Sequence, residues 1–93
     1  MDVKAAVHTA LEYVSDLFRD TQLYDLGLEE VTFDDAAGIW EVTVGFSRAW
    51  DYPKHSPFTS VIAGNVPKRN YKIVRVKDSD GHVESVKIRE LTG

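Results

Sequence analysis

The sequence predicts an α+β fold, in which one N-terminal amphipathic helix packs on a curled antiparallel sheet of about four strands. Apolar residues recur at three- and four-residue spacing over residues 3–20, the period of a helix with one buried face. Apolar and polar residues alternate over 39–47, the period of a half-buried strand. Two more alternating segments, 71–77 and 82–91, flank a turn that contains Asp and Gly, which is typical of a hairpin. We therefore expect a single domain, residues 1–93, with a two-layer core.

The N-terminal helix is expected to span residues 3–20. Asp2 is a candidate N-cap, because its carboxylate can accept hydrogen bonds from the free N–H groups of the first turn. Residues 23–27 are expected to end the helix or to add a short turn, and Gly27 suits a left-handed exit. The apolar stripe that should face the sheet consists of Val3, Val7, Ala10, Leu11, Val14, Leu17 and Phe18.

The segment 39–47 is expected to be the central strand, with its large apolar side chains packed against the helix. A shorter strand at 28–33 precedes it through a hairpin turn at 34–38. In the strand 71–77, alternation divides the residues between two faces. The apolar face of the central strand is Trp40, Val42, Val44 and Phe46, and the faces of the later strand are Tyr71, Ile73, Arg75 and Lys77 against Lys72, Val74 and Val76.

The loop 47–70 is the irregular part of the chain and contains all three prolines. It is long for a connection in a small domain, so we expect a short strand or helical turn near 58–63 within it. Trp, Tyr and Arg are the residue types that anchor protein interfaces, and the loop holds all three. The alternative is that Trp50 and Phe58 fold back and cap one end of the core. The candidate partner-binding residues are Arg48, Trp50, Tyr52, His55, Phe58 and Ile62.

Composition places the chain among ordinary globular proteins, since 43% of the residues are hydrophobic and 28% are charged. The net charge of −4 is unevenly divided, because residues 1–35 carry −7 (two bases, nine acids) and residues 36–93 carry +3 (nine bases, six acids). This asymmetry can help the two halves dock or can attract a basic partner. There is no run of about 18 apolar residues, no export signal and no cysteine. We therefore expect no membrane span, no disulfide and a cytoplasmic location.

Residues with catalytic or metal-binding chemistry do not form a recognisable motif. His8, His55 and His82 lack metal-ligand spacing. Residues 78–81, Asp-Ser-Asp-Gly, resemble the start of a calcium loop, but Arg89 occupies the twelfth position, where that loop requires a bidentate acid. No nucleophile elbow, pair of catalytic carboxylates or glycine-rich phosphate loop is present. We expect a protein that is not an enzyme and that binds no metal or cofactor.

A basic patch is the feature that points toward nucleic acid. Basic and aromatic side chains on an exposed sheet face hold single strands in some modules. The chain is acidic overall, however, and Glu41 is placed to neutralise part of the patch across the sheet. Nucleic acid is therefore disfavoured as a partner. The patch consists of Arg75, Lys77, Lys87 and Arg89, with Tyr71 nearby.

Two functions remain open. The favoured one is a small non-catalytic protein-interaction or regulatory module that contacts a partner through the loop 47–70 and an edge strand, and the same edge could form a homodimer. The alternative is a small-ligand-binding cup between the helix and the curled sheet, with the loop as its lid. The expected lining of this cup is Trp40, Val44, Phe46 and Tyr71.

Three segments are similar to known small modules: the helix 3–20, the strand Gly-Ile-Trp-Glu-Val-Thr-Val at 38–44, and Tyr-Lys-Ile-Val-Arg-Val at 71–76 with the turn Asp-Gly-His-Val at 80–83. Their order resembles cystatin-like and PepSY-like modules. The accessory O-type gas-vesicle proteins share a similar Trp-x-Val-x-Val strand, a proline-bearing loop and a strand led by Tyr. The resemblance implies a fold and not protease inhibition, because the Gln-x-Val-x-Gly loop of cystatins is absent: residues 41–45 lack its glutamine.

Overall fold

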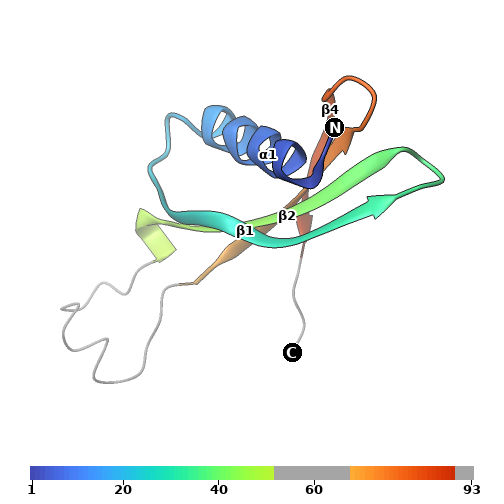
Figure 1. Ribbon diagram of the computed structural model, residues 1–93. Coiled ribbons are helices and arrows are strands. Elements are labelled where there is room, and N and C mark those ends of the chain that lie inside the picture. Colours follow the sequence, from blue (N-terminus) through green and yellow to red (C-terminus); the bar gives the residue numbers. More distant parts are fainter. Residues whose placement is uncertain (52–67, 90–93) are drawn as a thin grey trace.

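The structure, a computed structural model, describes residues 1–51 and 68–89 and shows one helix on a four-stranded antiparallel meander (Figure 1). The strands follow each other in the sheet in chain order, β1-β2-β3-β4. The predicted α+β class is confirmed. The elements are the helix α1 (Val3–Leu17), the strands β1 (Leu23–Asp34) and β2 (Ile39–Arg48), the short 3₁₀ helix η1 (Ala49–Asp51), and the strands β3 (Asn70–Lys77) and β4 (Val83–Arg89).

The helix begins as predicted and ends earlier. The Asp2 carboxylate accepts a hydrogen bond from the backbone N–H of Ala5 at 2.8 Å, so the expected N-cap is confirmed. The predicted helix, 3–20, is three residues too long, because Phe18 already leaves the helical conformation. Asp20 would place a negative charge at the negative end of the helix dipole, which disfavours extension.

The first strand is longer than predicted, because β1 begins at Leu23 and not at residue 28. Two register shifts, one between Tyr24 and Gly27 and one between Leu28 and Glu30, interrupt the pairing of β1 with β2. Each shift breaks the alternation of faces, and Asp25 adopts a positive φ of 55°. The period-2 pattern is therefore absent from residues 23–27, and Gly27 lies inside the strand instead of ending the helix.

The core lies between α1 and one face of the sheet. Small residues on the helix bring its backbone close to the sheet, and the even-numbered residues of β2 and β3 fill the space below. The predicted apolar face of β2 is confirmed, and Trp40 is its one half-buried member. The fully buried side chains are Ala6, Ala10, Val14, Val42, Val44, Phe46, Val74 and Val76.

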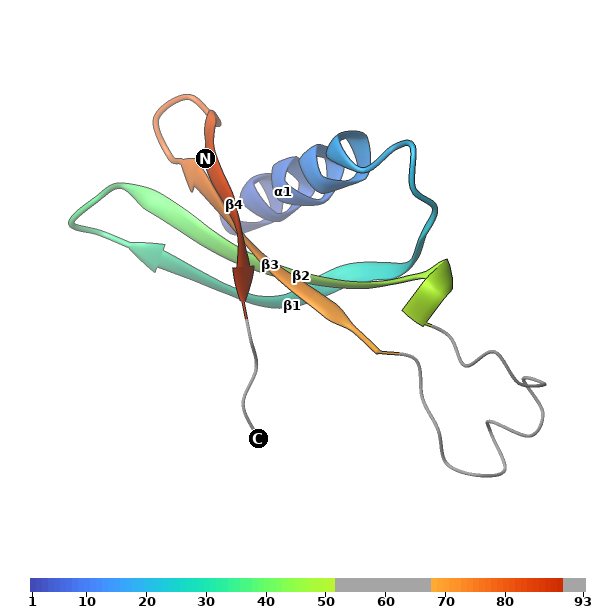
Figure 2. The same cartoon turned by 180° about the vertical axis from the view of Figure 1, so that it is seen from behind.

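The sheet is not strongly curled, which corrects that part of the expectation. The helix of 15 residues lies on one side of the sheet only, as both views show (Figures 1 and 2). A single helix of this length spans about 22 Å, so it offers too little surface for four strands to wrap around. The strands twist across one another and stay extended.

The remaining strands lie close to their predicted positions. β3 begins one residue before the expected 71–77, and β4 begins one residue after the expected start of 82–91, whose last two positions lie outside the described residues. Of the loop 47–70, β2 and η1 account for the start, and the possible element near 58–63 lies outside the described residues. In the described part of the chain, no helix is long and apolar enough to cross a membrane.

Candidate functional site

The candidate site lies where β2 ends and β3 begins, at the C-terminal end of the helix. Arg48 is the last residue of β2, and Trp50 lies in η1. These are the two candidate partner-binding residues that the structure describes, and it brings them together. We call this region the Trp50 end. The other four, Tyr52, His55, Phe58 and Ile62, lie outside the described residues.

Asp51 holds the end of β2 and the start of β3 together. Its carboxylate accepts hydrogen bonds from the backbone N–H of Arg48 at 2.8 Å and from the side-chain amide of Asn70 at 2.7 Å. The same amide group accepts a bond from the Arg48 guanidinium at 2.8 Å, which closes a triangle between η1, β2 and β3. Two backbone carbonyls add to it, since Asp51 accepts from Lys68 N–H at 3.2 Å and Lys68 accepts from the Ser47 hydroxyl at 2.9 Å. The start of η1 is thereby fixed relative to the sheet.

The Asp51 carboxylate is only 6% exposed, and its electrostatic surroundings compensate for that burial. Burial by itself raises the pKa of a carboxyl group. The hydrogen bonds from Arg48 and Asn70, with the positive charges of Arg48 and Lys68, outweigh burial and hold the pKa of Asp51 below its usual value of 3.8. Asp51 is therefore an ionised, structural carboxylate at neutral pH.

A row of three aromatic rings and two cations connects the helix to η1. The Phe18 and Phe46 ring centroids lie 5.7 Å apart. The Arg48 guanidinium lies 5.8 Å from the Phe46 centroid and 4.9 Å from the Trp50 centroid. At the other end, the Lys72 ammonium lies 5.9 Å from the Phe18 centroid. Phe46 is fully buried and Trp50 is 65% exposed, so the row runs from the core to the surface.

Lys72 belongs to this site, although sequence reasoning did not propose it. It lies opposite Val44 on β2 and Ile88 on β4, on the face of the sheet that the helix covers. Burial, together with the Arg48 charge, lowers the pKa of Lys72 below its usual value of 10.5. The signal in the sequence was a lysine at a position whose strand neighbours on the same face, Val74 and Val76, are both core residues. Lys72 therefore adds a second cation to the Trp50 end, close enough to Arg48 for the two charges to interact.

On the face of the sheet that the helix does not cover, ion pairs connect side chains of different strands. Arg75 pairs with Glu41 at 2.9 Å, as the sequence predicted for Glu41. Arg89 pairs with Glu30 at 3.2 Å and donates to the Thr43 hydroxyl at 2.7 Å. Thr43 is only 3% exposed, although no helix covers it. Two of the four expected basic-patch residues, Arg75 and Arg89, are thus neutralised by carboxylates of β1 and β2.

A third ion pair on this face of the sheet lies where residue 45 has no side chain. Arg69 and Glu29 lie 3.1 Å apart directly above Gly45, where an added Cβ would approach the Glu29 carboxylate to 2.7 Å and the Arg69 guanidinium to 2.8 Å. Both are ends of flexible side chains, so they can move aside.

We expect Gly45→Ala to separate Glu29 from Arg69 while changing the free energy of unfolding by less than about 1 kcal/mol, since pairs this exposed contribute little and alanine restricts the unfolded chain. A double-mutant cycle on Glu29 and Arg69, measured by urea denaturation in both backgrounds, checks this. The coupling free energy should vanish in the alanine background, and an unchanged coupling would contradict the geometry.

At the opposite end of the molecule, the polar contacts have a structural role. The Trp40 indole N–H donates to the Asp78 carboxylate at 2.9 Å, and the N-terminal ammonium lies 3.4 Å from the same oxygen. The turn 78–81 is closed by its own hydrogen bonds, with Gly81 at a φ of 74°. In residues 1–51 and 68–89, no group of three or more His, Asp or Glu residues is arranged to hold a metal.

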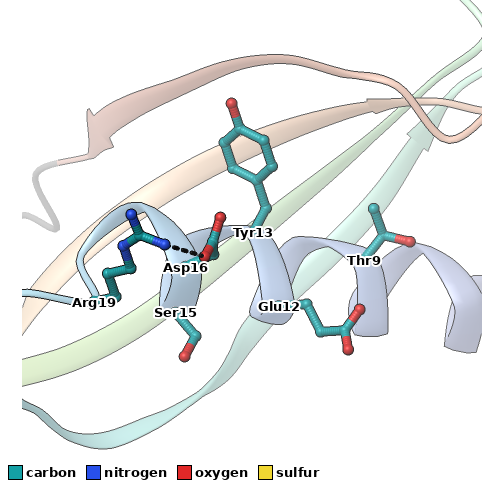
Figure 3. A pocket seen from close by; sticks show the side chains of 6 residues that line it. All are labelled: Thr9, Glu12, Tyr13, Ser15, Asp16 and Arg19. Atoms are coloured by element: carbon teal, nitrogen blue, oxygen red, sulfur yellow. Dashed lines mark ion pairs between the residues drawn. The ribbon is translucent and has the colours of Figure 1, made fainter.

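The expected lining of the ligand cup does not share one face. Val44 and Phe46 lie under the helix and are fully buried, whereas Tyr71 pairs with Gly45 and faces the other side of the sheet. A hollow does occur on the outer side of α1, where its lining side chains point into solvent around the helix (Figure 3). It is formed by α1 and Arg19, which follows the helix, and it holds one 3.9 Å ion pair, between Arg19 and Asp16, so nothing about it defines a binding site. The lining residues are Thr9, Glu12, Tyr13, Ser15, Asp16 and Arg19.

The fold and the Trp50 end define a class: a small α+β domain with one helix on a four-stranded antiparallel meander and an exposed aromatic–cation site at one end. The chain matches no protein-family model, no curated protein and no solved structure.

Proposed function

We propose that the chain is a small, non-catalytic interaction or regulatory module whose protein partner contacts the Trp50 end. The observation that carries the proposal is Trp50, a large aromatic side chain that is 65% exposed and yet is held on a fixed turn. The Arg48 guanidinium packs on its ring, and Asp51 fixes the turn to both strands. A preorganised Trp beside an Arg loses little conformational entropy on binding, which is why such residues dominate interface energies.

The charge of the site indicates the chemistry of the partner. Arg48 and Lys72 each lie against an aromatic ring of the row. Lys68, two residues before the start of β3, is exposed. The carboxylate among them, Asp51, is buried and already bonded. The partner that fits is therefore an acidic segment that also carries an apolar or aromatic residue to pack against Trp50. Its binding should weaken as the salt concentration rises, because salt screens the charges.

Affinity capture from the native host's extract, with matched variants, tests this proposal. The wild type is compared with Trp50→Ala and with Phe33→Ala, an exposed aromatic at the far end of the sheet that stacks on Trp40. We expect a partner that elutes with rising salt, is lost by folded Trp50→Ala and is kept by Phe33→Ala. Retention of the same partner by Trp50→Ala would contradict the proposal.

Lys72→Met separates binding from stability. The lysine charge is partly desolvated on an apolar face, so we expect methionine to leave the free energy of unfolding unchanged or to raise it by up to about 1 kcal/mol. Capture of the acidic partner should nevertheless weaken, because one of the cations is lost. Unchanged capture would show that Lys72 does not contact the partner, and a loss of stability would show that Lys72 has a structural role.

The resemblance to cystatin-like modules is retained as part of the proposal, at the level of a distant relationship. The order of one helix and four antiparallel strands supports it. Residues 41–45, which would have to supply an inhibitory loop, lie inside β2 and pair with β1 and β3, so the proposed binding site is the Trp50 end. A cytoplasmic location also remains part of this proposal.

A further inference from the structure

The outer edge of β4 exposes the most accessible large apolar side chain of residues 1–51 and 68–89. Ile88 is 74% exposed, and it lies opposite Lys72 on the face of the sheet that carries the helix. β4 is the last strand of the sheet, so no strand within the described ranges pairs with its outer backbone groups. A free edge with an apolar side chain is a template for another strand.

The two edges of the sheet differ in how they are protected. β1 carries two register shifts, a positive φ at Asp25 and the adjacent acids Glu29 and Glu30, which are features that obstruct pairing. β4 has one shift, near Glu84, and pairs regularly with β3 from Ser85 to its end. The edge that is open to pairing is therefore that of β4.

We propose that β4 pairs antiparallel with β4 of a second copy of the chain, in the register centred on Val86. A two-fold axis perpendicular to the sheet keeps each residue on its own face. In this register Val86 lies opposite itself. The register shift leaves Glu84 out of the pairing, so Ile88 lies opposite Val83 of the second copy on the helix side. On the other side, Lys87 lies opposite Ser85 of the second copy and beside its Glu84, so the charges are complementary.

The neighbouring registers are each disfavoured by the sequence of β4. Centring on Lys87 places two lysines directly opposite each other, and centring on Ile88 places Lys87 opposite Arg89, in both cases like charges. Centring on Ser85 places Ile88 opposite residues that precede Val83 and lie outside β4, so Ile88 stays uncovered. Lys87 is exposed and makes no ion pair with any described residue, so the proposed register gives it a partner.

This inference concerns a different surface and does not rest on the proposed function. Because the chain has no cysteine, single-cysteine variants test the register directly. Cα atoms of directly opposed residues lie about 4.5–5.5 Å apart, within reach of a disulfide. Under mild oxidation, Val86→Cys should form a covalent dimer rapidly and Lys87→Cys should not. Efficient cross-linking at residue 87 with none at 86 would overturn the register.

Light scattering after size exclusion, over a range of concentrations, tests the dimer itself. We expect Ile88→Arg to raise the dissociation constant about tenfold or more, since it places a charge in the apolar strip. Leu28→Arg is the matched control on the other edge, and Trp50→Ala separates the dimer from the partner site; both should dimerise like the wild type. A wild type that stays monomeric at every concentration, or an Ile88→Arg variant that dimerises as well, would overturn the proposal.

Discussion

Replacing Phe46 by alanine is expected to lower the free energy of unfolding by about 3–5 kcal/mol, the cost of emptying a fully enclosed aromatic site. Phe46 is 0% exposed, is the last residue of the core face of β2 and contacts the Phe18 ring. Its loss removes buried apolar area and leaves a cavity in the core cluster. Urea denaturation followed by circular dichroism measures the effect.

The control for Phe46 is its neighbour in the aromatic row. Trp50→Ala should change the free energy of unfolding by less than about 1 kcal/mol, because only the contact with Arg48 is lost from an exposed position. This pair of results separates the two hypotheses for the loop. Equal losses for both variants would mean that Trp50 caps the core, and the Trp50 end would then have no exposed anchor.

Asp51→Ala is the second change with a large expected effect, about 2–4 kcal/mol of lost stability. The substitution leaves the Arg48 N–H and the Asn70 amide without their acceptor. It also removes a carboxylate that is 6% exposed and lies 3.7 Å from the Arg48 guanidinium. The cost is that of unpaired buried donors, which exceeds that of a surface ion pair. Denaturant unfolding checks it, and a loss below about 0.5 kcal/mol, as for a surface position, would contradict the arrangement.

The same carboxylate predicts a pH dependence. The pKa of Asp51 is lower in the folded chain than its usual value, so its contribution to stability is complete above about pH 4 and is lost as the pH falls through the folded pKa. The pKa of Asp78 is lowered as well, by the Trp40 hydrogen bond and, against a smaller effect of burial, by the N-terminal ammonium. Asp51→Asn and Asp78→Asn should therefore each flatten the acid limb of the stability profile. An acid limb unaffected by Asp51→Asn would contradict the lowered pKa.

The elements with regular periodicity could be predicted from the sequence. The alternation of β2 and β3 and most of the helix stripe could be predicted, because residues that share a face recur at a fixed spacing in the local sequence. Two members of the predicted stripe, Val3 and Leu17, are exposed, and Ala6, which was not in it, is buried. The first half of β1 could not be predicted this way, because its register shifts remove the alternation at residues 23–27. How strongly the sheet curls depends on how one helix packs against four strands. No local sequence pattern predicts that packing.

The candidate site was predictable only in part. Arg48 and Trp50 were found from their residue types, and the structure brings them together. Asp51, Asn70 and Lys72 were not found, because their roles arise from the pairing of β2 with β3, which joins residues about twenty positions apart in the chain. The ion pairs on the uncovered face also arise from strand pairing, since Arg89 on β4 reaches Glu30 on β1, the strand at the other edge of the sheet.

The central claim is that Trp50 is a fixed, solvent-facing anchor that a partner covers. The chain has two tryptophans, so Trp40→Phe leaves Trp50 as the single tryptophan, whose emission can be excited at wavelengths that the four tyrosines do not absorb. We would measure acrylamide quenching of this variant, free and with the captured partner. The account predicts red-shifted, strongly quenched emission in the free chain, and protection from quenching when the partner is bound. Blue-shifted emission that resists quenching in the free chain, or no change with the partner, would contradict it.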